Sequence, residues 1–116
     1  MRFPKNRPWR SEKHRRNVAS LPCVNCGVQG RTQAAHANFG KGLSLKSCDS
    51  QLMALCNICH RLHDSGGIYD NKQARWRREV EMVDLTRAEL ISRSLWTSEI
   101  ESAYRKAYEP MRRAAA

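Results

Sequence analysis

Long apolar runs and acidic residues are both scarce in this sequence. Its 116 residues contain no stretch approaching the roughly 18 consecutive apolar residues that a membrane span needs, so we expect no membrane protein. No apolar segment follows the basic N-terminus, and we therefore expect no secretory signal and a cytoplasmic location. A chain of this length has room for one small domain and little room for a second core.

The scarcity of acids leaves a strongly basic chain, because 21 lysines and arginines face 11 acidic residues. Residues 1–22 hold seven basic residues and one acid, whereas the rest of the chain is more nearly balanced. A basic arm of this kind is typical of nucleic-acid binding, because its cations replace the counterions of phosphates. The alternative is a solvated tail that only aids solubility. The cations that we expect to contact DNA are Arg2, Lys5, Arg7, Arg10, Lys13, Arg15, Arg16, Lys41 and Lys46.

The chain divides into three parts, and together they predict a small α+β fold. A basic N-terminal arm with a short helix covers residues 1–22, a compact central part covers 23–69, and a helical extension covers 70–116. In the first part we expect a loose arm over residues 1–10. Ser11 then caps a helix over residues 12–20.

The central part has two short apolar segments that predict strands, over residues 32–37 and 51–56. A helix is expected to begin near His60 and to end at Gly66 and Gly67.

In the extension, Asp70 or Asn71 is expected to cap one helix. Capping boxes predict two further helix starts, Thr86 with Glu89 and Ser98 with Glu101. The last helix is amphipathic, and Pro110 is expected to end it. We interpret its aromatic residues as core packing rather than as a stacking surface.

Two CxxC pairs stand 29 residues apart, Cys23 with Cys26 and Cys56 with Cys59. In a reducing cytoplasm disulfides are rare, and paired spacings of this kind favour a metal. Zinc takes four ligands in a tetrahedron, so the two pairs predict one structural Zn²⁺ bound by four cysteines. The alternative is four unrelated buried cysteines. Cys48 has no partner at ligand spacing and is expected to be a plain thiol.

The four cysteines would saturate the zinc, which leaves four polar residues without a structural role: His36, His60, His63 and Asp64. On a helix that begins at His60, His60 and Asp64 share one face at i and i+4, and His63 at i+3 is a substitute ligand. A histidine and a carboxylate, with water completing the shell, suit a catalytic Mg²⁺ or Mn²⁺. The alternative is that these are polar surface residues.

Three quoted segments carry a family resemblance: "LPCVNCG", "AAHANFGKG" and "LMALCNICHRLHD". In combination they resemble the HNH endonucleases of the ββα-metal type, in the version supported by a four-cysteine zinc. The similarity is greatest to the YbcO-like phage and prophage group. It covers residues 21–67 and extends more loosely into the helical extension. The resemblance implies a ββα-metal core, a phage or prophage origin, and partners among phage recombination or replication proteins.

The resemblance also implies roles for individual residues. His36 matches the general base, His60 a metal ligand and Asp64 the second ligand on the helix. Two positions depart from the family pattern. Ala35 stands where many members have a metal-binding residue, and Gln51 stands where the pattern has the asparagine that holds the loop of the base.

Three residues are candidates to position His36 in place of that asparagine: Gln51, Asn38 and Asp49.

Two functions are therefore open. The leading one is a metal-dependent DNA endonuclease, in which His36 takes a proton from water and the ion at His60 and Asp64 offsets charge in the transition state. The alternative is a non-catalytic zinc-ribbon module that binds DNA. The departures at Ala35 and Gln51 favour the module. The presence of His36, His60 and Asp64 together favours the nuclease.

Overall fold

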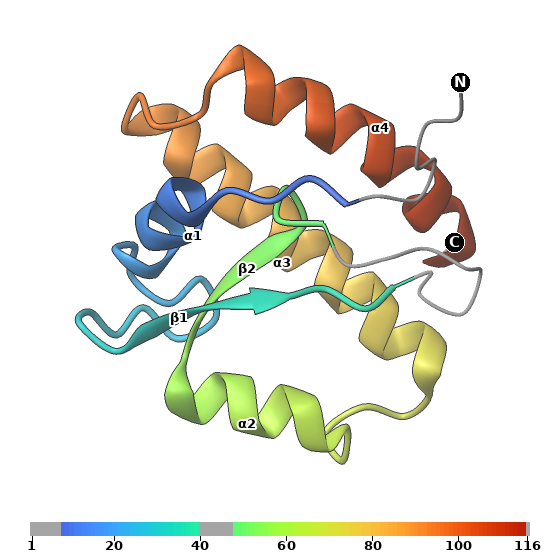
Figure 1. Cartoon of the computed structure of the whole chain (residues 1–116). Coiled ribbons are helices and arrows are strands. Elements are labelled where there is room, and N and C mark those ends of the chain that lie inside the picture. Colours follow the sequence, from blue (N-terminus) through green and yellow to red (C-terminus); the bar gives the residue numbers. More distant parts are fainter. Residues whose placement is uncertain (1–7, 40–47, 116) are drawn as a thin grey trace.

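Helices surround a small antiparallel sheet (Figure 1). The computed structural model of the chain describes residues 8–39 and 48–115, and of residues 110–115 the backbone alone. The described part contains, in chain order, α1 (Glu12–Ala19), β1 (Thr32–His36), β2 (Leu52–Cys56), α2 (Asn57–Ser65), α3 (Lys72–Ser92) and α4 (Ser98–Ala115). The predicted small α+β class is therefore confirmed, as are both predicted strands to within one residue. Within the described segments, every helix is too short or too polar to cross a lipid bilayer.

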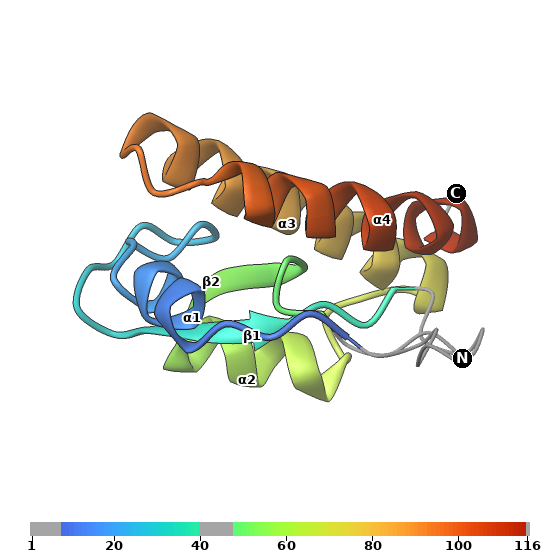
Figure 2. The ribbon, with the colours of Figure 1, turned by 45° about the horizontal axis from the view of Figure 1, so that its top comes forward.

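The two strands pair antiparallel, with Thr32 opposite Cys56 and His36 opposite Leu52. Successive side chains of a strand point to opposite faces, so each face has its own core. One face joins the sheet to α3 and α4 through Ala35, Met53, Leu55, Met82, Val83, Tyr104 and Tyr108. The other joins it to α1 and the end of α3 through Val18, Leu21, Leu52, Ala54 and Leu90. In a second view α2 lies below the sheet and α4 above it (Figure 2).

Helix α3 closes the edge of β2 that β1 leaves unpaired. The Thr86 hydroxyl accepts a hydrogen bond of 3.0 Å from the buried Ala54 amide and donates one of 2.8 Å to the Met82 carbonyl. The Ala54 carbonyl accepts from the Val24 amide at 2.8 Å. Both backbone groups of Ala54 are thus satisfied without a third strand.

The N-terminal segment is docked rather than loose where it is described. Ser11 caps α1 as predicted, and its side chain accepts a hydrogen bond from the His14 amide. Before it, the Asp49 amide donates to the Trp9 carbonyl at 3.0 Å, and the Trp9 indole donates to Glu99 at 3.1 Å. The expectation of a loose arm over residues 1–10 is therefore wrong for residues 8–10, and residues 1–7 lie outside the described part.

Two predicted helix starts need correction. Helix α2 begins at Asn57 rather than near His60, because the Cys56 sulfur caps it by accepting from the Cys59 amide. The C-cap, Gly66, has a left-handed φ of 75°, as the predicted stop at glycine requires. Helix α4 is capped by Thr97 rather than by Ser98, because the Thr97 hydroxyl accepts a hydrogen bond from the Ile100 amide.

The last two corrections concern helix interiors. Thr86 starts no helix: it lies inside α3, whose N-cap is Asn71, one of the two predicted candidates. Pro110 does not end α4, which runs on to Ala115. The interpretation of the aromatic residues is confirmed, since Tyr104 and Tyr108 are buried against the core.

Candidate zinc centre and histidine sites

The four predicted zinc ligands lie together. Their Sγ atoms are all within 4.8 Å of one another: Cys23, Cys26, Cys56 and Cys59. The Sγ atoms of Cys26 and Cys56 are 3.7 Å apart. Two sulfurs of a tetrahedral zinc site are separated by about 3.8 Å, given a Zn–S bond of about 2.3 Å. The cluster therefore fits one structural zinc. Cys48 is outside it, with its sulfur 3.0 Å from the Ser50 hydroxyl.

Each CxxC pair lies on a turn whose amides face the sulfurs. The Cys26 amide donates to the Cys23 sulfur at 3.5 Å, and the Cys59 amide donates to the Cys56 sulfur at 3.4 Å. Gly27 closes the first turn with a φ of 84°, which side-chain-bearing residues rarely adopt. In the second pair, the cap of α2 and the metal turn are the same structure.

The thiols of this cluster differ in their pKa. Burial opposes ionisation of Cys23, but amide hydrogen bonds from Cys56, Cys26 and Asn25 lower its pKa to about 6. Burial, together with the neighbouring sulfurs, raises the pKa of Cys59 to about 12 despite a hydrogen bond from Asn25. Four adjacent thiolates repel one another unless a positive ion lies between them. Zn²⁺ is the ion that this donor set suits.

Asn25 connects the zinc centre to α3. Its Nδ2 donates to the Cys59 sulfur at 3.3 Å, and its Oδ1 accepts from Arg78 at 2.9 Å. Partners of this kind orient metal ligands and are part of the site. Sequence reasoning missed Asn25. Its place inside the first CxxC, with a side chain that both donates and accepts, is the signal that could have found it.

His36 forms a dyad with Asp49 at the end of β1. Its Nε2 lies 2.8 Å from Asp49 Oδ1. The Asp49 side chain has no solvent exposure, whereas that of His36 is 31% exposed. With the carboxylate accepting from Nε2–H, the lone pair is on Nδ1, and no residue in the described part of the chain hydrogen-bonds that atom. In this dyad Asp49 orients the His36 ring, and Nδ1 is left to accept a proton or a hydrogen bond, as a general base requires.

Asp49 is held as a buried anion. Burial would raise its pKa, but hydrogen bonds from the Ser11 amide, His36 and Arg10 hold the pKa of this carboxyl below its usual value. The Ser11 bond is 2.8 Å, and Arg10 and Arg15 approach at 3.2 and 3.5 Å. The dyad thus combines a fixed carboxylate with two arginines that are each about half exposed.

His60 and Asp64 form a separate pair on the surface of α2. His60 Nε2 lies 3.3 Å from Asp64 Oδ2, and Nδ1 lies 2.7 Å from the Gln33 amide oxygen. Gln33 stands three positions before His36 in β1, so the two side chains point to opposite faces of the sheet. Among the described residues, no recognised hydrogen bond or ion pair joins His60 or Asp64 to the dyad of His36 and Asp49. In the described segments, the four cysteines are the sole group of three or more potential ligands within coordinating distance.

His63 is a buried structural residue. Its side chain is 3% exposed, its Nε2 lies 2.5 Å from Glu79 Oε2 and its Nδ1 lies 2.7 Å from the Tyr69 hydroxyl. Glu79, with no solvent exposure, also accepts from the Asn38 amide at 2.7 Å. His63 is thus not available as a substitute ligand for an ion at His60. A carboxylate on the apolar face of α3 is the signal that could have identified Glu79 as a buried partner.

The remaining predicted site residues are dispersed. Gln51 is buried and donates to the Ser50 hydroxyl at 3.2 Å, so of the three candidates for positioning His36 only Asp49 contacts it in the described part. Lys13 is exposed, and Arg16 forms an i,i+4 pair with Glu12. Five of the cations predicted to bind DNA lie outside the described residues: Arg2, Lys5, Arg7, Lys41 and Lys46.

Comparison with known proteins gives one family and no individual relative. Neither the curated proteins nor the solved structures contain a match to this chain. A family model does match, and it covers the docked N-terminal segment, the sheet, the zinc centre and most of α3. The chain belongs to the family described as "Protein of unknown function (DUF968)", whose model matches residues 1–88.

Proposed function

We propose that the chain is an HNH-type DNA endonuclease that hydrolyses phosphodiester bonds with His36 as general base. The observation that carries this proposal is the dyad of His36 and buried Asp49, with Arg10 and Arg15 beside it. A partly exposed imidazole that is oriented by a buried carboxylate is the arrangement that base catalysis needs. The order β1, β2, α2 around a four-cysteine site supports the resemblance to zinc-supported HNH enzymes.

In this mechanism each residue of the dyad has one task. Asp49 accepts from Nε2–H of His36 and so fixes the ring orientation and tautomer. His36 Nδ1 takes a proton from water, and the resulting hydroxide attacks phosphorus as the 3′ oxygen leaves. Proton transfer to a positioned base contributes about 10²- to 10⁴-fold in rate.

The two arginines supply the positive charge that a phosphodiester substrate requires. Arg10 Nη1 lies 3.2 Å from Asp49 and 3.3 Å from His36, and its side chain is 51% exposed. Arg15 approaches Asp49 from α1 with 45% of its side chain exposed. Guanidinium groups bind phosphate oxygens through paired N–H donors, and they remain charged at all working pH values. They can therefore hold the phosphate beside His36 and stabilise the charge that develops on it.

A catalytic divalent ion, Mg²⁺ or Mn²⁺, would be held by His60 and Asp64. Their 3.3 Å separation fits neighbouring positions around such an ion, which are about 3 Å apart for oxygen ligands at about 2.1 Å. Gln33 holds the other ring nitrogen of His60, as partners of metal-bound histidines do. When bound, the ion supplies charge stabilisation to phosphate oxygens. Because no contact in the described part of the chain joins this pair to His36 and Asp49, the dyad and this pair are separate components of the proposal.

The same separation favours the alternative, a zinc-supported DNA-binding module without catalysis. In that case the histidines contact phosphate or solvent, and the zinc centre and the cations carry the function. The two functions differ in one measurable property, which is cleavage.

Plasmid nicking by purified protein, with and without added Mg²⁺ or Mn²⁺, tests the proposal. We expect His36→Ala and Asp49→Asn each to lower the nicking rate by about 10² or more while zinc content and DNA binding remain. Glu109→Gln, which changes an exposed carboxylate on α4, is the matched control and should nick like the wild type. Wild-type rates in both dyad variants, or no nicking by the wild type, would leave the binding module as the function.

His60→Ala tests the divalent ion separately. We expect it to retain zinc, fold and DNA binding and to lose the part of the nicking that depends on added Mg²⁺ or Mn²⁺. If His60→Ala responds to these ions like the wild type, His60 is not a ligand, and the dyad alone remains.

A further inference from the structure

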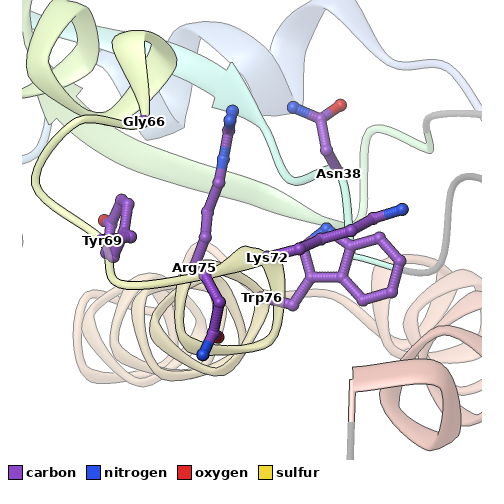
Figure 3. A pocket seen from close by; sticks show the side chains of 7 residues that line it. Asn38, Gly66, Tyr69, Lys72, Arg75 and Trp76 are labelled. Atoms are coloured by element: carbon purple, nitrogen blue, oxygen red, sulfur yellow. The ribbon is translucent and has the colours of Figure 1, made fainter.

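A cavity of about 740 Å³ lies at the start of α3, outside the zinc centre and the dyad. We call it the α3 cavity. Its wall is contributed by the chain after β1, the link between α2 and α3, and the first turns of α3, in the residues Asn38, Gly66, Tyr69, Asn71, Lys72, Arg75 and Trp76. Figure 3 shows Lys72 lying across the Trp76 ring system and Arg75 extending toward the opposite wall.

The α3 cavity is lined by cations and by no carboxylate among the described residues. Lys72 is exposed, and its Nζ lies 4.7 Å from the centre of the Trp76 ring. Among the described residues, Arg75 pairs with the carboxylate of Glu79, whose Oε2 is 3.7 Å from Nε and already pairs with His63. Arg75 Nε is buried and has no hydrogen-bond partner. The positive charge of Arg75 is therefore only loosely matched by the protein, and the N-terminus of α3 adds to it.

The same cavity offers a flat apolar surface. Trp76 is half buried, and it packs against the core while one side of its ring system lines the cavity. Lys72 covers that ring through a flexible stem, so its ammonium can move to an anion and uncover the ring. An indole face beside two cations matches a planar base joined to a phosphate.

We propose that the α3 cavity binds one unpaired nucleotide of the DNA substrate, with the base against Trp76 and the phosphate at Lys72 and Arg75. This inference rests on the proposed function in taking DNA as the ligand. The cavity volume lies in the range of about 300–1,000 Å³ that small-molecule sites occupy, and a nucleotide fits such a site. A base inside a cavity cannot remain paired in a duplex. The protein therefore selects DNA with a single-stranded segment or a branch.

Equilibrium binding to two fluorescent probes tests this inference, an oligothymidylate strand and a duplex of the same length. The full-length protein with zinc is used, in a His36→Ala background and without added Mg²⁺ or Mn²⁺, so that the probes stay intact. We expect Trp76→Leu to weaken binding of the strand at least about fivefold and to change duplex binding little. We expect Lys72→Gln to lower the slope of log affinity against log salt by about 0.7 for the strand.

Arg77→Gln is the matched control, because Arg77 is an exposed cation on the same helix that does not line the α3 cavity. It should keep strand affinity within about twofold of the background. If Trp76→Leu loses zinc or helical signal, Lys72→Gln decides, since it changes an exposed side chain. Strand binding by Lys72→Gln that matches Arg77→Gln in slope and affinity would overturn the inference, and so would equal losses for strand and duplex in Trp76→Leu. Nicking by the unmutated protein is measured separately, so a failed nuclease assay together with Trp76-dependent strand binding rejects the proposed function alone.

Discussion

At the scale of single residues, environment decides what each histidine can do. His60 and His63 are three positions apart on one helix, yet His60 shares the surface with Asp64 while His63 is enclosed by Glu79 and Tyr69. His36 differs from both, because a buried carboxylate holds one ring nitrogen and solvent reaches the ring. The residue type alone therefore does not identify a ligand or a base. The partners on each nitrogen do.

His14 provides a prediction on pH. Its ring is 2% exposed and lies between Trp9 and Trp96, with ring centres 5.5 and 5.8 Å away, and its Nδ1 has no hydrogen-bond partner. Burial lowers its pKa below 6.5, against a smaller opposing effect of Asp49. The unfolded chain consequently binds a proton that the folded chain refuses once the pH falls below about 6.5. The contribution of His14 to the free energy of unfolding is therefore fully present above about pH 6.5. It is lost as the pH falls toward the lowered pKa of the folded state.

We expect His14→Phe to reduce the loss of unfolding free energy between pH 8 and pH 5.5. The variant keeps an aromatic ring between the two tryptophans and removes the group that titrates. Urea denaturation of wild type and variant at both pH values gives the effect as a difference of differences, which cancels contributions of the zinc ligands and other histidines. Equal losses in the two proteins would show that His14 is protonated as readily in the folded state as in the unfolded one.

At the scale of elements, α3 does more than cover the sheet. In 21 residues it contributes Met82 and Val83 to one core, Leu90 to the other, and Thr86 to the edge of β2 between them. The length of the helix follows from this position, since ending it at Thr86 would remove its contact with the second core. A helix that terminates a sheet in this way replaces a strand neighbour with a side-chain hydroxyl.

Thr86→Val should therefore destabilise the protein although it preserves side-chain shape. The valine cannot accept from the Ala54 amide, which is buried, and an unsatisfied buried donor costs about 1–3 kcal/mol. Thr86→Ser, which keeps the hydroxyl, is the control and should retain protection of the Ala54 amide in hydrogen exchange. The role of Thr86 would be refuted by a valine variant that has wild-type unfolding free energy and a wild-type exchange rate at Ala54.

Elements set by local chemistry were predictable, and those set by distant contacts were not. Ser11 and Asn71 cap helices through amides three residues ahead, and Gly66 supplies a left-handed C-cap, so neighbouring residues were enough to identify them. Thr86 looked equally like a cap, but its hydroxyl is used by Ala54, 32 positions away. Pro110 likewise lies inside α4 rather than at its end.

In the candidate site, too, features set by neighbouring residues were predictable and features set by distant contacts were not. The CxxC spacing identified all four cysteines of the cluster, because each pair needs only one turn to present two sulfurs. By contrast, the partner of His36 was left open among three residues, since the choice depends on how the segment at Asp49 docks against Trp9 and Ser11. Burial of His63 depended on Glu79, 16 positions away in another helix.

At the scale of the whole molecule, the four-cysteine cluster joins the parts of a small protein. It ties the turn at Cys23 to the junction of β2 and α2, and Asn25 extends the connection to Arg78 of α3. The N-terminal segment is linked separately to the start of α4, where the Trp9 indole donates to Glu99. The four-cysteine cluster therefore supports the same β1–β2 frame that carries His36.

Loss of the zinc should consequently unfold the domain rather than loosen one turn. Binding of structural zinc provides about 10–16 kcal/mol in small domains, as much as or more than the roughly 5–15 kcal/mol that holds a typical fold together. We expect one zinc per chain by elemental analysis, and loss of both zinc and helical circular dichroism on chelation or in Cys26→Ser. Cys48→Ser is the matched control: it makes the same substitution at a buried cysteine outside the cluster, where a hydroxyl can keep the contact with Ser50. It should retain the metal and the fold. A zinc-free Cys26→Ser protein with an unchanged spectrum would mean that the apolar cores alone hold the fold, and that the four sulfurs lie together for another reason.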